Sequence, residues 1–138
     1  MKLAQLGAGA GAILGGVALA CAAVSPQTPS PDQDFALKAG ATARIEGSDL
    51  AVRFDDVTND SRCPVDVQCI TAGDATVALF VTGGGAAEAT HQVHTLDEPR
   101  EARHGAWRVA LVRLEPRPVS TRKTPRGDYV VTLRVSRG

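Results

Sequence analysis

Residues 74–82 read DATVALFVT, and this stretch decides the fold that we expect for the chain. Its small and apolar residues fill both alternating sets of positions, which is typical of a strand covered on both faces. Three glycines at 83–85 end the run, and no sustained helical period follows Phe35. The core of the protein is therefore predicted to be a β-sheet with this stretch near its middle.

Shorter runs of alternating apolar and polar residues lie on both sides of it. Residues 128–135 alternate most cleanly, with Tyr129, Val131, Leu133 and Val135 on one face. Further strands are predicted over residues 35–38, 42–46, 50–57, 89–96 and 107–114. Residues 97–105 are predicted to form a polar loop, and the proline-containing residues 115–127 a long irregular connection. About seven short strands favour an all-β fold, a small antiparallel sandwich of the immunoglobulin-like type, over a closed barrel.

Length and composition allow one such domain. The chain has 138 residues, of which 43% are hydrophobic and 22% are charged, as in a globular protein. Its net charge is zero, but residues 1–99 hold five Lys/Arg and twelve Asp/Glu, and residues 100–138 hold ten and three. This imbalance of −7 and +7 either pairs between neighbouring strands or offers a surface to an acidic partner. The chain has no basic arm with interleaved aromatic residues, so nucleic acid is not a predicted partner.

The N-terminus is typical of an export signal. Lys2 precedes an uncharged stretch of Ala, Gly, Leu, Ile and Val, which predicts a signal peptide over residues 1–20. A permanent membrane span is the alternative, but the many glycines make the stretch only mildly apolar.

Residues 17–21, VALAC, resemble the lipobox of bacterial lipoproteins, in which the cysteine thiol receives a diacylglyceryl group before cleavage. The resemblance implies a lipid anchor on Cys21, and therefore attachment to a membrane of the cell envelope. Ala22 resembles the sorting signal for an outer membrane, if the cell has one. Ala18 stands where the lipobox prefers Leu, so a simple A-x-A cut that leaves Cys21 free is the alternative.

The proline-rich residues 21–34 are predicted to be a tether between this anchor and a domain over residues 35–138.

Cys63 and Cys69 are the two cysteines that remain, and an even pair in an oxidising compartment predicts a disulfide. The disulfide would close a short loop between two strands. A redox-active dithiol is the alternative, but such motifs have closer spacing and a helical start, which this segment lacks.

The same segment carries a family resemblance. Residues 60–64 (DSRCP), followed by VQCI at 67–70 and AGDA at 72–75, resemble a motif of small bacterial envelope lipoproteins that are mostly uncharacterised. Thr71 stands where an aromatic residue is expected in that group. The closing segments LEPRP and GDY, at 114–118 and 127–129, are similar to the end of the same proteins. The resemblance implies a location and a stapled loop, but no particular activity.

Two groups of side chains invite a metal hypothesis. Six oxygen-bearing side chains surround the cysteine loop, namely Asp55, Asp56, Asn59, Asp60, Asp66 and Asp74. They do not meet the EF-hand spacing, because Ser61 and Val67 stand where its glycine and its closing glutamate belong. Histidines occur at 91, 94 and 104, but in a strand His91 and His94 point to opposite faces, so they are interpreted as exposed solvated side chains. We therefore predict no metal and no cofactor.

No nucleophile elbow, phosphate-binding loop or zinc-binding helix motif is present, so the protein is predicted not to be an enzyme. The leading hypothesis is a non-catalytic envelope lipoprotein that binds an envelope protein, a glycan or a small ligand, or has a structural role. Its predicted contact residues are Arg62, Asp66 and Gln68 in the cysteine loop. The alternatives are an inhibitor that inserts the Cys63–Cys69 loop into an exported hydrolase, and a metal-binding envelope protein.

Overall fold

The computed structural model describes Gly11, Gly15, Gly16 and residues 27–138. Cys21 and nearly all of the predicted signal peptide lie outside the described residues. The described part contains eight strands and one short 3₁₀ helix: β1 (Asp34–Lys38), β2 (Thr42–Arg44), β3 (Ala51–Asp60), β4 (Ala75–Thr82), β5 (Ala89–His94), β6 (Glu101–His104), β7 (Trp107–Glu115), η1 (Arg126–Asp128) and β8 (Val130–Arg137). None of its helices has the length and apolar character needed to span a membrane.

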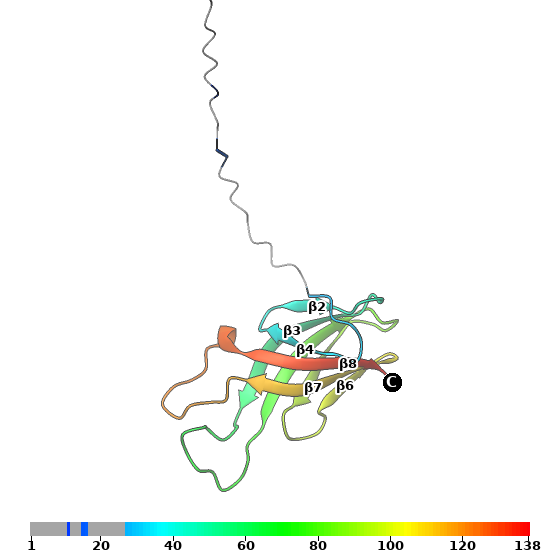
Figure 1. Ribbon diagram of the computed structural model, residues 1–138. Helices are drawn as coiled ribbons and strands as arrows, with labels where there is room; N and C mark the ends of the chain where they lie inside the picture. Colours follow the sequence, from blue (N-terminus) through cyan, green and yellow to red (C-terminus); the bar gives the residue numbers. More distant parts are fainter. Residues whose placement is uncertain (1–10, 12–14, 17–26) are drawn as a thin grey trace, which may run out of the picture.

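The strands form two four-stranded antiparallel sheets that pack face to face (Figure 1). One sheet has the order β1-β8-β7-β6 and the other β2-β3-β4-β5. The predicted small antiparallel sandwich is confirmed. Its strands follow one another as a meander, and β1 returns to pair with β8, without the Greek-key crossovers of a true immunoglobulin domain in residues 27–138.

The opening stretch is β4, which lies between β3 and β5 as its two-sided apolar pattern predicts. Val77, Leu79 and Val81 are fully buried, and the alternate residues Thr76 and Ala78 are less than a tenth exposed. Aromatic anchors and aliphatic side chains of the other strands complete the core: Phe35, Leu37, Val52, Phe54, Val93, Trp107, Val109, Tyr129, Val131, Leu133 and Val135. Burial of each large aliphatic side chain contributes roughly 1.5 to 3 kcal/mol.

The prediction of a polar loop over residues 97–105 is wrong in part, because β6 lies within it. Ala102 and His104 of this strand are buried, while Glu101 and Arg103 face solvent. The strand is only four residues long and its inward positions hold alanine and histidine, so its sequence carries a weak hydrophobic alternation.

Four connections lie at one end of the sandwich: β1–β2, β3–β4, β5–β6 and β7–β8. Asp60 pairs with Ala75 at the end of one sheet, and Glu115 pairs with Val130 at the end of the other. A hydrogen bond of 2.8 Å from the Tyr129 hydroxyl to Asp60 joins these two ends. The long β3–β4 and β7–β8 connections therefore meet, and the C-terminus lies at the opposite end (Figure 1).

The part of the predicted tether that is described is docked on the domain. Gln27 forms a parallel bridge with Ala43 in β2, and the N–H of Arg44 donates to the Gln27 carbonyl at 2.9 Å. Farther along, the Ser30 hydroxyl donates to Glu46 at 2.6 Å. The described part of the chain is therefore held to the sheets from Gln27 onward, several residues before Phe35.

Packing and backbone conformation both require glycine at positions 83 and 84. Both have positive φ, 78° and 69°. A Cβ on Gly84 would lie 2.8 Å from Trp107 and 2.9 Å from Leu50, which is closer than carbon atoms approach. Gly85 also has a positive φ, 79°, but a Cβ there would meet nothing within 4 Å.

Gly84 and Gly85 allow a matched test of the packing against Trp107. We expect Gly85→Ala to lower the free energy of unfolding by about 1 kcal/mol, the cost of a left-handed backbone with a side chain. Gly84→Ala has the same backbone cost and in addition displaces Trp107, for a total of about 2 to 4 kcal/mol. Urea unfolding of the two full-length variants measures both. Equal losses would show that Trp107 moves aside freely.

Candidate interaction surface

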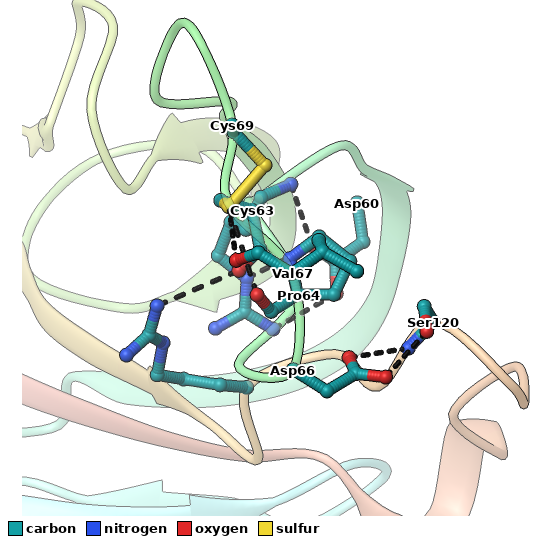
Figure 2. Close-up of a disulfide and its surroundings, with 9 residues drawn as sticks. Asp60, Cys63, Pro64, Asp66, Val67, Cys69 and Ser120 are labelled. Atoms are coloured by element: carbon teal, nitrogen blue, oxygen red, sulfur yellow. Dashed lines mark hydrogen bonds and ion pairs between the residues drawn. A yellow bond between two sulfur atoms is a disulfide. The ribbon is translucent and has the colours of Figure 1, made fainter.

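The β3–β4 connection, residues 61–74, contains the predicted disulfide. Cys63 and Cys69 are bonded with a Cα–Cα distance of 5.9 Å, which lies in the usual range (Figure 2). Closing so short a ring removes freedom from the unfolded chain and stabilises the fold by roughly 2 to 3 kcal/mol. We call residues 63–69 the stapled loop.

Ser61 and Asp74 close the base of this connection. The N–H and the hydroxyl of Ser61 both donate to the Asp74 carbonyl at 2.8 Å, and the N–H of Asp74 donates back to the hydroxyl at 3.1 Å. A Cβ on Gly73 would lie 1.6 Å from the Ser61 carbonyl oxygen. Only glycine fits where the two backbones approach so closely.

The Asp74 carboxylate fixes the neighbouring β5–β6 connection. It accepts hydrogen bonds from the N–H groups of Leu96 and Asp97 at 2.8 and 3.2 Å, and it pairs with Nδ1 of His94 at 2.6 Å. Burial alone would raise the pKa of Asp74, but these donors outweigh it and lower the pKa to about 2. Asp74 therefore joins the β3–β4 connection to the β5–β6 connection through a charged side chain.

Arg62 braces the stapled loop from inside, although it was predicted to be a contact residue. Its guanidinium makes two hydrogen bonds of 2.8 Å to the two carboxylate oxygens of Asp60. It also donates to the carbonyls of Leu114 and Pro116, at 2.7 and 2.8 Å. The side chains of Arg62 and Asp60 are only 13% and 12% exposed, so neither charge is free to meet a partner.

Asp60 joins the two segments that carry the family resemblance. Burial would raise its pKa, but the hydrogen bonds from Arg62 and from the Tyr129 hydroxyl lower it. The pKa of Tyr129 is raised by burial and by the same carboxylate. The DSRCP and GDY segments, nearly 70 residues apart, therefore meet in one charged cluster, Arg62, Asp60 and Tyr129.

Asp66 also bonds within the protein. Its carboxylate accepts from the N–H of Ser120 at 2.9 Å and from the Ser120 hydroxyl, and these bonds lower its pKa (Figure 2). Next to it, the N–H of Val65 donates to the Pro118 carbonyl at 3.0 Å. Of the three predicted contact residues, only Gln68 lies exposed without a role in this bracing.

Three apolar side chains are exposed in this loop region, a feature that the sequence analysis missed. Val65 and Val67 are 54% and 44% exposed, and Ile70, just after the disulfide, is fully exposed. We call these three residues the apolar tip. The signal was present in the sequence, because a valine–valine pair inside a disulfide ring cannot reach the core.

The histidines do not lie as expected. His91 and His94 are on opposite faces of β5, as predicted, but His104 is only 3% exposed. Nε2 of His104 donates to the Gly83 carbonyl at 3.1 Å, which leaves Nδ1 to accept from Nε2 of His91, also at 3.1 Å. Burial lowers the pKa of His91, and so does the repulsion between two positive charges that would arise beside His104. The pair joins β5 to β6 at the seam between the sheets.

The acidic residues around the loop are dispersed among separate partners. Asp55 pairs with Arg53, Asp56 with Arg126, and Asp60 with Arg62. In residues 27–138, no three His, Cys, Asp or Glu side chains converge on a point where they could hold a metal ion. Comparison of the chain with models of known families, with curated proteins and with solved structures finds no match.

Because the Arg62 guanidinium makes four hydrogen bonds, three of them part-buried, its replacement should destabilise the fold strongly. We expect Arg62→Met to lower the free energy of unfolding by about 2 to 4 kcal/mol, because it leaves the Asp60 charge and two carbonyls without their partner. Arg113→Met is the matched control, since Arg113 and its partner Glu115 are both more than half exposed, and it should change stability by less than about 0.5 kcal/mol. Denaturant unfolding compares the two. Similar losses would mean that Arg62 does not brace the loop.

Asp74 predicts a specific dependence on acid. Its pKa is 3.8 ordinarily and about 2 in the folded protein, so its stabilisation is complete above about pH 5 and is lost as the pH falls through the folded-state value. We expect Asp74→Asn to lower stability at pH 7 by roughly 1 to 2 kcal/mol and to flatten the decline between pH 4 and 2. Asp97→Asn, at an exposed neighbouring carboxylate, should leave the profile unchanged. An equally steep decline in both variants would contradict the role of Asp74.

Proposed function

We propose that the protein is an exported, lipid-anchored and non-catalytic binding module of the bacterial envelope, which contacts a partner protein through the apolar tip. One observation carries the proposal. The tip lies on a loop that is held by a disulfide, by hydrogen bonds that Arg62 donates and by hydrogen bonds that Asp66 accepts from Ser120.

The proposal of a lipid anchor rests on the VALAC sequence that ends at Cys21. Gln27 lies on the outer edge of β2, and the stapled loop projects from the other side of the sandwich (Figure 1). The chain therefore enters the domain on a side away from the apolar tip, which leaves the tip accessible to other envelope molecules.

The electrostatics of the loop support a non-catalytic role. The pKa values of Asp60, Asp66 and Asp74 are all lowered, because each carboxylate accepts hydrogen bonds that favour its charged form. A general acid or base at neutral pH requires a shift in the opposite direction. These groups support the loop instead of titrating near neutral pH.

The rigidity of the loop supports binding. Apolar side chains on or next to a loop that is already held in place lose little conformational entropy when a partner covers them. Such side chains in a desolvated pocket of the partner commonly contribute most of the binding energy. Their exposure in the free protein costs stability, which is expected where the surface is used for binding.

Site-directed photo-crosslinking tests this proposal in intact cells. A photoreactive residue at Ile70 should give one discrete adduct with an envelope protein. The same probe at Glu88, an exposed residue at the other end of the sandwich, should not give it. With the probe at Ile70, Val65→Ser combined with Val67→Ser should reduce the adduct at least tenfold, the effect of losing about 1.4 kcal/mol. Equal adducts at both probe positions, or none at Ile70, would refute the tip as the contact surface.

The second candidate is an inhibitor of an exported hydrolase. A braced loop with a fully exposed isoleucine has the form of a side chain that enters an enzyme pocket. The crosslinking result separates the two candidates, because an inhibitor would be joined to a hydrolase whose activity the purified protein lowers.

A further inference from the structure

We propose that a cleft beside the stapled loop binds an acidic oligosaccharide, at a site separate from the apolar tip. The cleft lies between the end of β3 and the β7–β8 connection and has a volume of about 710 Å³. This volume lies within the range of small-molecule sites. Asp56 to Asp60 form one wall, residues 122–126 the other, and Tyr129 lies between them.

The wall formed by the β7–β8 connection is fixed although most of it has no regular secondary structure. One side is held to the stapled loop by the Val65–Pro118 bond and by Asp66 on Ser120. The other side is held to β3 by Arg126, whose guanidinium lies 3.3 Å from Asp56 and also donates to the Asp55 carbonyl. These contacts place both walls in the free protein, so less of the cleft has to be ordered by a ligand.

The charge of the cleft selects an anion. Two acidic lining residues are already compensated, Asp56 by Arg126 and Asp60 by Arg62. Arg122 lies 3.8 Å from Asp128, but both side chains are more than half exposed and the pair is weak. Lys123 has no ion-pair partner in residues 27–138. Two cations at the rim therefore remain available.

The distribution of charge over the chain supports this point. If the acidic and basic parts of the sequence paired with each other, most ion pairs would join them. Only two of the eight described ion pairs do so, Arg126 with Asp56 and Arg134 with Asp34. The positive excess of residues 100–138 thus stays largely uncompensated, and part of it borders the cleft.

The uncharged lining favours a saccharide over a bare anion. The hydroxyl groups of Thr58 and Thr124 and the amide of Asn59 can bond with sugar hydroxyls, and Pro118 and Pro125 offer apolar surface to a ring face. A lone phosphate would use the rim cations and leave most of the cavity unfilled. A sugar chain that carries carboxylates matches both the rim and the lining.

Titration calorimetry of the full chain tests the proposal, with trigalacturonate as the probe. We expect saturable binding with a Kd below about 1 mM. Arg122→Gln combined with Lys123→Gln should weaken it at least tenfold, because two charge-assisted contacts are lost. Arg100→Gln combined with Arg103→Gln changes the net charge equally, at exposed residues outside the cleft, and should leave the Kd within about twofold.

Neutral galactotriose and inorganic phosphate are the comparison ligands, and both should bind at least tenfold more weakly. Equal binding of phosphate, an equal effect of the two double variants, or no saturation at about 10 mM trigalacturonate would each overturn the proposal. The experiment leaves Val65, Val67 and Ile70 unchanged. Its failure therefore says nothing against the apolar tip, and a failed crosslink at Ile70 says nothing against the cleft.

Discussion

The bidentate pair between Arg62 and Asp60 is the interaction on which one whole end of the molecule depends. A single guanidinium there satisfies a carboxylate of β3 and two carbonyls at the end of β7, so it joins the two sheets where their backbone ladders stop. Because both side chains are mostly buried, neither could lose its partner without leaving a charge in a poorly hydrated place. The disulfide closes the loop, and the hydrogen bonds of Arg62 tie the start of the loop to the end of β7.

The strands could be predicted from the sequence because their pattern is local. Within eight residues, the apolar run of β4 indicates a strand buried on both faces, and the alternation of β8 indicates a strand with one buried face. The disulfide was predictable for a similar reason, since Cys63 and Cys69 are the two cysteines that follow Cys21 and leave one pairing between them. β6 was missed because its inward residues are Ala102 and His104, and a buried histidine looks like a surface residue until its partners, His91 and the Gly83 carbonyl, are known.

The role of the loop residues could not be predicted in the same way. Arg62 and Asp66 look like contact residues in a polar loop, but besides Asp60 their partners lie more than 50 residues away, on Leu114, Pro116 and Ser120. Those partners are backbone groups or a serine, which carry no recognisable pattern of their own. The structure gives the residues of this segment a physical role: Ser61, Gly73 and Asp74 form the base of the connection, and Asp60 and Arg62 form the brace.

The bracing of this end is uneven, and that unevenness bears on how its two surfaces relate. The bonds of Arg62 lie in a mostly buried place, so breaking them is costly. The bonds between Asp66 and Ser120 are exposed, and water can replace them at little cost. Motion between the stapled loop and the wall of the cleft would therefore break the Asp66–Ser120 bonds before those of Arg62. The backbone bond from Val65 to Pro118 joins the same two segments, so the apolar tip and the cleft wall are connected through Val65 as well as through Asp66.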